Sequence, residues 1–266
     1  MGTVIDLHTH ILPGVDDGVK TEDDAVAFAR TAVADGTTTM VATPHCKEGF
    51  FYIDRPAVLE ATERLRQRLA RESVPLSVLP GAEVHLTHDL PARVKDGRAP
   101  TLADNGKTLL LELSTSQYPV DLENLVFQLK LAGIVTLFAH PERIRYFQDD
   151  VRRYASVIRL GAFGQVTTGS VLGQFGEETE EFSEEIVRKG LVHVLASDSH
   201  NLRGRPPVMS KARERLSAWV GEVRAAAMVD AVPRALLEGR EPDLEPLPEE
   251  PRRRNFLGRL LGRGRD

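Results

Sequence analysis

The chain has 266 residues, of which 41% are apolar and 27% charged, and it carries a formal net charge of -5. This length suits one large α/β domain or two small ones, and the negative charge disfavours a nucleic-acid binder, which usually carries a basic face. No apolar stretch is long enough to span a bilayer, the N-terminus lacks an apolar signal core, and the single cysteine excludes an internal disulfide, so the sequence predicts a cytoplasmic, single-domain protein.

Short apolar runs alternate with longer segments of helical period along the chain. The runs, rich in Val, Leu, Ile and Thr, predict strands buried on both faces of a parallel sheet at 3–7, 38–43, 76–80, 108–113, 134–139, 163–167 and 192–197. The segments between and after them predict helices at 22–35, 54–72, 121–132, 149–160, 178–189, 209–220 and 223–238. Seven β-then-α units favour a closed parallel barrel, and a doubly wound open sheet is the competing architecture.

The first predicted helix has sequence signals at both of its ends. Thr21 can cap its N-terminus, and Asp24 three residues later gives a variant of the capping box. Gly36 follows the last apolar position and is predicted to end the helix.

The character of the chain changes after residue 240, so 1–240 is predicted to be the folded domain and 241–266 a linker and tail. Residues 241–251 (EPDLEPLPEEP) are acidic and proline-rich, which predicts an extended linker. Residues 252–265 (RRRNFLGRLLGRGR) are basic with interleaved Phe and Leu. Two interpretations stay open: a flexible tail, or a weak amphipathic segment that contacts an anionic membrane surface or an acidic partner.

Imidazoles and carboxylates lie at the C-terminal ends of six of the seven predicted strands. His8 and His10 close the first strand and point the same way if the strand continues through them. The other strands are followed by His45, Glu83, Glu112, His140, Asp198 and His200. The C-terminal strand ends of a parallel barrel share one face, so we expect these groups to converge. Imidazole and carboxylate ligands suit Zn, Fe or Mn, which predicts a multinuclear metal site.

Other reactive residues receive a structural interpretation. His193 starts the last strand, at the opposite end of the barrel, whereas His85 and His88 follow Glu83, and only His85 is a candidate to face the site. Trp219 lies on an apolar helix face and is predicted to be core. A cysteine phosphatase of the C-x5-R type is disfavoured, because Tyr52 stands where the arginine after Cys46 would be, and no GxSxG motif of serine hydrolases occurs.

The motifs HTHILPGVDDG, ATPH, GAEVH, LLLEL, HPER, GSVLGQFG and SDSHN followed by RPP resemble the PHP (polymerase and histidinol phosphatase) superfamily. Within it, the DDG after HTH and the RPP after SDSHN resemble the metal-dependent bacterial protein-tyrosine phosphatases of the CpsB/CapC/YwqE type, over about residues 3 to 240. The resemblance implies a single-domain, distorted TIM-like (β/α)7 barrel that holds two to three divalent metal ions, manganese foremost, with iron or zinc as alternatives.

The resemblance also implies three groups of metal ligands. The first ion would take His8, His10, Glu83 and Asp198; the second would share Glu83 and add Glu112 and His140; the third would take Asp17, His45 and His200. The loop after HTH carries two adjacent acidic residues, and Asp17 is preferred over Asp16 as the ligand.

Two arginines match the phosphate-binding arginines of the family: Arg143 in HPER and Arg205 in RPP. The family usually has a tyrosine directly after HPER, whereas this chain has Ile144 and then Arg145, which could compete with Arg143 for phosphate.

The activity implied is hydrolysis of phosphotyrosine, on a bacterial tyrosine kinase that controls capsule or exopolysaccharide biosynthesis, by attack of a hydroxide bridging two metals. One alternative is a PHP phosphoesterase that acts on a small-molecule phosphate such as histidinol phosphate. The other is a non-catalytic metal-binding module that only binds a partner. The oligomeric state and the general acid stay open.

Overall fold

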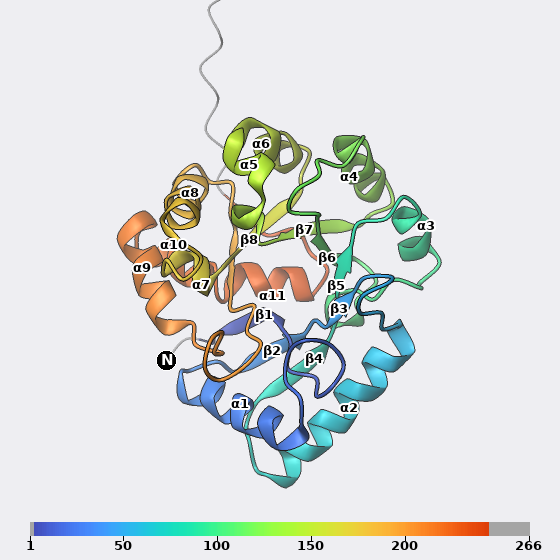
Figure 1. Ribbon diagram of the computed structural model, residues 1–266, viewed down its shortest axis with the longest axis vertical. Coiled ribbons are helices and arrows are strands. Elements are labelled where there is room, and N and C mark those ends of the chain that lie inside the picture. The colour runs from blue at the N-terminus through green and yellow to red at the C-terminus, as the bar shows by residue number, and fades with distance from the viewer. Residues whose placement is uncertain (1–2, 245–266) are drawn as a thin grey trace, which may run out of the picture.

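Parallel strands in two sheets form the centre of the molecule, of which the computed structural model describes residues 3–244 (Figure 1). The first sheet has the order β1-β2-β4, with β1 at Ile5–Thr9, β2 at Thr39–Ala42 and β4 at Ser77–Pro80. The second has the order β3-β5-β6-β7-β8-β9. Its strands are β3 (His45–Cys46), β5 (Glu83–His85), β6 (Thr108–Glu112), β7 (Val135–Ala139), β8 (Phe163–Thr167) and β9 (Val194–Ala196).

Two predicted strand paths are interrupted, and each contributes to both sheets. The second path runs as β2 and then β3 on either side of Pro44, which cannot donate a backbone hydrogen bond. The third runs as β4 and then β5 around Gly81, where a Cβ atom would lie 2.8 Å from Cγ1 of Val41. Beyond these breaks, the same pair of paths continues in the second sheet as β3 beside β5.

The ring of strands closes between β1 and the segment that follows β9. The His8 carbonyl accepts from the Asp198 amide at 2.9 Å, and the His10 amide donates to the Ser199 carbonyl at 2.9 Å. Within the described residues, seven parallel strand paths therefore form a closed barrel, as predicted, and the open doubly wound sheet is excluded.

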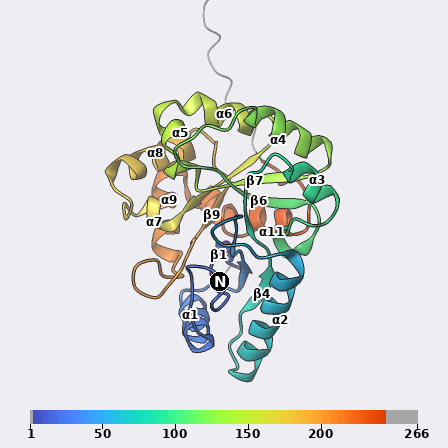
Figure 2. The same ribbon diagram turned by 45° about the vertical axis from the view of Figure 1, so that its right-hand side comes forward.

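Helices surround this barrel in both views (Figures 1 and 2). They are α1 (Glu22–Ala34), α2 (Arg55–Arg71), α3 (Leu90–Lys95), α4 (Leu122–Leu131), α5 (Arg145–Asp149), α6 (Val151–Arg159), α7 (Thr168–Val171), α8 (Glu177–Arg188), α9 (Ser210–Val220), α10 (Glu222–Ala227) and α11 (Ala231–Leu237). Two 3-10 turns add η1 (Leu102–Asp104) and η2 (Pro141–Arg143). No helix within residues 3–244 is both long and apolar enough to cross a membrane.

Helix α11 closes the N-terminal end of the barrel. Its Val232 and Leu236 are buried in one apolar cluster with Ile5 of β1 and Leu110 of β6. The Leu236 carbonyl accepts from the Thr108 hydroxyl at 2.6 Å, at the start of β6. Apolar packing thus fills this end, and the opposite, C-terminal end is left to carry polar side chains.

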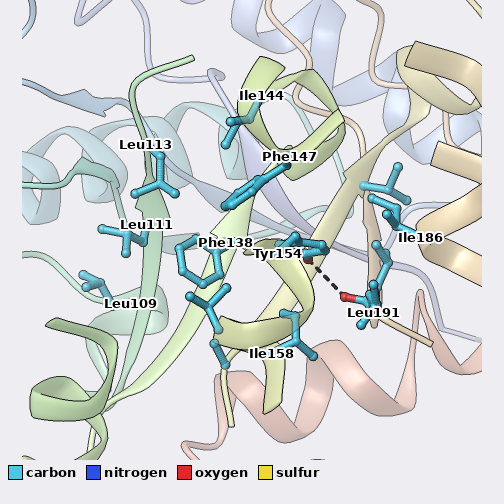
Figure 3. Packing of buried hydrophobic residues seen from close by; sticks show 14 of the residues in the cluster. Leu109, Leu111, Leu113, Phe138, Ile144, Phe147, Tyr154, Ile158, Ile186 and Leu191 are labelled. Atoms are coloured by element: carbon cyan, nitrogen blue, oxygen red, sulfur yellow. Dashed lines mark hydrogen bonds between the residues drawn. The ribbon is translucent and has the colours of Figure 1, made fainter. Parts of the chain in front are cut away.

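The larger outer core packs between the strands and the helices α4 to α9. Leu109 and Leu111 of β6 and Phe138 of β7 point into it together with Tyr154 of α6 (Figure 3). The Tyr154 hydroxyl donates to the Leu191 carbonyl at 3.0 Å, so its polar atom is paired inside an apolar layer.

The predicted signals at both ends of α1 are confirmed. The Thr21 side chain, in extended backbone, accepts from the Asp24 amide at 3.1 Å, and Gly36 adopts φ of +102° just beyond the helix. One helix prediction was wrong: 223–238 is two helices, α10 and α11, separated at Met228–Asp230. Pro233 explains the restart, because proline is accepted in the first turn of a helix and breaks one in its interior.

The predicted domain boundary at residue 240 stays a prediction. Helix α11 ends just before it, at Leu237, and the basic segment 252–265 lies outside the described residues.

Candidate metal centre

Five histidines from the ends of four strand paths meet at the C-terminal rim of the barrel. The ring centres of His10 and His200 are 3.9 Å apart, those of His10 and His45 4.6 Å, and those of His8 and His140 5.7 Å. All are buried except His45, which is partly exposed. The convergence predicted from the strand ends therefore holds for every one of these imidazoles.

The tautomers of His8 and His10 leave two lone pairs facing each other. Nδ1 of His8 lies 2.9 Å from Oε1 of Gln165, and Nδ1 of His10 lies 2.7 Å from Oδ2 of Asp16. In the neutral form that a metal ligand requires, each ring can donate from Nδ1 to the oxygen that it faces, which leaves its Nε2 atom as the acceptor. These two Nε2 atoms are only 3.2 Å apart. A cation between them would satisfy both lone pairs, which is the fit expected of a metal site.

Glu83 lies at the centre of the cluster and is fully buried. Its Oε1 is 2.7 Å from Nε2 of His140, and its Oε2 is 2.8 Å from Nδ1 of His45 and 3.4 Å from Nε2 of His8. Glu83 therefore contacts imidazoles from three strand paths. A buried carboxylate needs such compensation, because desolvation of an isolated charge is very costly.

Asp198 connects the histidines to the predicted arginines. Its Oδ1 is 3.4 Å from Nε2 of both His8 and His10, and its Oδ2 accepts from Nη1 of Arg143 at 2.7 Å. Arg205 donates to the same Oδ2, and its Nη1 also lies 3.1 Å from Nε2 of His200. Both guanidinium groups are about one quarter exposed, with side-chain values of 27% and 25%. They therefore stand at the open side of the cluster.

Arg145 does not compete for this position. Its Nη1 contacts both carboxylate oxygens of Glu178, at 2.9 and 3.0 Å, and its side chain is 61% exposed. Arg145, which follows HPER and Ile144, thus points away from Asp198, and Arg143 and Arg205 remain the two arginines beside it.

Two adjacent aspartates take different places. Asp16 is buried and accepts from Nδ1 of His10, from the Gly18 amide at 2.9 Å and from the His45 amide at 3.1 Å. Burial alone would raise the pKa of Asp16, but the hydrogen bond and charge of His10 lower it to about 2. Asp17 instead points its Oδ1 to within 3.5 Å of Nε2 of His45 and 3.4 Å of Nε2 of His200. Asp16 orients His10, a candidate ligand, from behind, and Asp17 lies among the candidate ligand atoms.

Candidate ligand atoms within 4.8 Å of one another form four overlapping groups in the described chain. They are His10–Asp17–His45–His200, His8–His10–Asp198, His8–Glu83–His140 and His45–Glu83–Glu112. The predicted first and third groups largely recur. The predicted second group is divided, because His140 gathers with His8 and Glu112 with His45, while Glu83 belongs to both.

Two of these residues occupy unusual backbone conformations directly after their strands. His140, after β7, has φ of +35°, and Asp198, two residues after β9, has φ of +50°. Left-handed backbone is unfavourable for residues other than glycine and concentrates at functional sites. Here it turns both side chains toward the cluster.

The electrostatics of the cluster favour positive charge in its interior. Burial lowers the pKa of His10, but hydrogen bonds with Asp16 and Asp198 outweigh it and raise the pKa to about 10. His200 behaves oppositely, since burial and the charge of His10 lower its pKa to about 3, which keeps its ring neutral. Without a metal, the buried carboxylates thus favour a proton on His10, and a bound cation would take the place of that proton on Nε2 and supply the same positive charge.

Sequence reasoning missed or undervalued three supporting residues. Gln165 holds His8 and could have been noticed as a polar residue in an apolar strand. His85 lies on β5 two residues after Glu83, with Nδ1 3.1 Å from Oε2 of Glu112, so it borders the site. Glu142 of HPER is buried and accepts from both the amide and the hydroxyl of Thr167, each at 3.0 Å.

The residues interpreted as structural are so placed. Nδ1 of His193 accepts from the Gly164 amide at 3.0 Å, and burial lowers the pKa of His193 to about 4. Trp219 and Cys46 are buried in the outer core.

A closed parallel barrel with clustered imidazoles and carboxylates at its C-terminal rim defines a TIM-like barrel protein of the metal-dependent hydrolase type. Residues 4–238 match the family model described as capsular polysaccharide synthesis, CpsB/CapC. The chain belongs to this family, which confirms the resemblance seen in its motifs.

Individual relatives agree with this assignment. The chain is 37% identical to tyrosine-protein phosphatase YwqE of Bacillus subtilis over 202 residues, 76% of this chain and 79% of the relative. It is 28% identical to tyrosine-protein phosphatase CpsB of Streptococcus agalactiae over 227 residues, 84% of this chain and 93% of the relative.

Solved structures extend the comparison to the fold. One from the work on YwqE of Bacillus subtilis and CpsB of Streptococcus pneumoniae, described as unique metal-dependent tyrosine phosphatases, has a TM-score of 0.87 and 33% identity, covering 93% of this chain and all (100%) of that chain. An Escherichia coli phosphotriesterase homology protein has a TM-score of 0.53 at 12% identity, covering 86% of this chain and 95% of that one, and shows a shared fold only.

Proposed function

We propose that this protein is a metal-dependent protein-tyrosine phosphatase that acts in capsule or exopolysaccharide biosynthesis. The observation that carries the proposal is the position of Asp198, which faces the histidine cluster with one oxygen and Arg143 and Arg205 with the other. Cations on one side and arginines on the other are what a phosphoryl group needs. The family and the phosphatase names of its relatives support this substrate.

The proposed cofactors are two to three divalent metal ions, manganese foremost, with iron or zinc as alternatives. The facing lone pairs of His8 and His10, and the buried Glu83 among imidazoles, fit such ions. The residues that would hold them are His8, His10, Asp17, His45, Glu83, Glu112, His140, Asp198 and His200. When bound, these ions would lower the pKa of coordinated water and withdraw charge from a phosphoryl oxygen.

The chain's own residues bind the phosphoryl group and orient the histidine rings. Arg143 and Arg205 are permanently charged, and each guanidinium can hold two phosphoryl oxygens from the open side of the cluster. Asp16 and Gln165 fix the imidazole planes of His10 and His8, so the ligand atoms do not have to reorganise. A tyrosine leaving group has a parent pKa of about 10, which makes its departure feasible without a strong acid.

The proposed protein substrate is a phosphorylated bacterial tyrosine kinase of the capsule system, and the proposed location is the cytoplasm. The family description and the relatives' names support a role in capsule synthesis.

The test is hydrolysis of a phosphotyrosine peptide, a phosphoserine peptide and histidinol phosphate by manganese-loaded protein, before and after chelation. We expect metal-dependent turnover of phosphotyrosine, loss of turnover in His8→Ala and His45→Ala, and normal turnover in His88→Ala, a matched change at an exposed histidine. Faster hydrolysis of histidinol phosphate than of the phosphotyrosine peptide would mean that the substrate is a small-molecule phosphate. Absence of turnover with metal bound would favour a non-catalytic module. Full activity after removal of all metal would contradict the proposal altogether.

A further inference from the structure

A pocket of about 250 Å³ opens beside Arg205, between the segment after α7 and the segment before α9. Its wall includes Thr168, Leu172, Phe175, Arg205, Pro206 and Val208. Helices α7 and α9 pack against each other, and Figure 1 shows them on the same side of the barrel. The volume lies below the range of about 300–1,000 Å³ typical of small-molecule sites, so it suits a single side chain.

Phe175 is the aromatic wall of this pocket. Its ring lies 4.7 Å from the guanidinium carbon of Arg143 and 6.0 Å from that of Arg205. On another side it packs over Gly169, where a Cβ atom would come within 2.7 Å of a ring carbon. Phe175 is nevertheless 37% exposed, as is its neighbour Leu172 at 38%. A ring fixed by glycine and arginine but left open to a pocket is available to a ligand.

The motif GSVLGQFG, which supplies these residues, has no place among the candidate metal ligands. The pocket shares Arg205 with the phosphate-binding side of the site. In an aryl phosphate the ring is separated from phosphorus by one oxygen atom. A ring attached to a phosphate bound by Arg143 and Arg205 is therefore within reach of Phe175.

We propose that this pocket binds the aryl ring of phosphotyrosine, packed against Phe175, and so selects aryl over alkyl phosphates. This inference rests on the proposed phosphatase function and adds a specificity-determining residue to it. Paired aromatic rings gain free energy beyond the area they bury, and a phosphoserine side chain has no ring to place there.

A second exposed aromatic residue near the site, Phe51, is an alternative partner for the aryl ring of the substrate. Phe51, also 37% exposed, stacks on His45 with ring centres 6.0 Å apart. It follows β3 in the chain and forms an isolated β-bridge with Lys47. It does not line the pocket, which is why the proposal commits to Phe175.

The experiment measures binding rather than turnover, by calorimetric titration of the manganese-loaded protein with benzylphosphonate and methylphosphonate. These two probes carry the same anionic group with and without a ring. We expect the intact protein to prefer benzylphosphonate by roughly tenfold. Phe175→Ala should lose most of that preference, and Phe175→Tyr, which keeps the ring, should retain it. Phe127→Ala removes an exposed ring from α4, on the opposite side of the barrel from α7 (Figures 1 and 2), and should not change the preference.

Three results would overturn the inference. The first is an intact protein that binds both phosphonates equally well. The second is a Phe175→Ala variant that binds both more weakly by the same factor, because Phe175 would then only position the arginines. The third is loss of the preference in Phe51→Ala instead. A retained benzyl preference in a protein that does not hydrolyse phosphotyrosine would instead count against the proposed function alone.

Discussion

Asp16→Asn tests whether the residue behind the cluster controls metal binding. The carboxylate accepts three N–H groups, with Oδ2 serving His10 and His45 and Oδ1 serving Gly18. An amide has only one oxygen, so in either orientation its NH2 group faces at least one buried N–H donor. An unpaired buried donor costs about 1–3 kcal/mol, and loss of a carboxylate that orients a ligating histidine typically costs about 10–100-fold in metal affinity.

The assay is the rate of phosphotyrosine-peptide hydrolysis as a function of free manganese concentration. For Asp16→Asn we expect the half-saturating concentration to rise about 10–100-fold while the maximal rate is largely recovered at saturation. Asp17→Asn is the contrasting variant, because Asp17 is half exposed and lies among the ligand atoms. Its maximal rate should fall and stay low at every concentration. A folded Asp16→Asn protein with an unchanged manganese dependence would refute this reasoning.

Three further predictions concern other parts of the molecule. Arg205→Ala should lower kcat/KM for phosphotyrosine at least about tenfold and weaken inhibition by inorganic phosphate, whereas Arg145→Ala should leave both unchanged. Thr21→Ala should lower the free energy of unfolding by about 1 kcal/mol in urea titration, because it removes the cap on the Asp24 amide. Burial lowers the pKa of His193 from 6.5 to about 4, so in that window the unfolded chain binds a proton that the folded chain does not. Stability should therefore fall as pH falls from 6.5 to 4, by up to about 1.4 kcal/mol per pH unit, and metal-free His193→Gln should show a flatter dependence.

The parallel barrel and the location of the cluster could be predicted from the sequence because both follow from short periodic patterns. His8 and His10 share a direction on one strand, and Glu83, Glu112 and His140 come directly at or after apolar runs, so barrel topology alone brings them to one rim. Their convergence needed no knowledge of loop conformation.

Features that depend on tertiary contacts escaped prediction. Breaks at Pro44 and Gly81 divide two strand paths between sheets, and no local pattern reveals that the same path will change partners. Helices α3, α5 and α7 have only 6, 5 and 4 residues, too few for a helical period to be visible. The grouping of candidate ligands also differs from the predicted one. Glu112 lies with His45 because β3 and β6 both flank β5.

One supporting residue could have been predicted from the sequence. Gln165 stands alone as an amide in the apolar strand 163–167, and buried amides need partners. Asp16 could not be separated from Asp17 without coordinates, because adjacent residues in a loop have no fixed relative direction. The structure separates them by burial and by the atoms that they face.

The most direct test of a metal cluster at this rim is anomalous X-ray diffraction from crystals of the manganese-loaded protein, recorded above and below the manganese absorption edge. We predict anomalous peaks between His8, His10 and Asp198, and beside Glu83 and Asp17, that vanish below the edge. Loaded crystals without such peaks among these side chains would contradict the account.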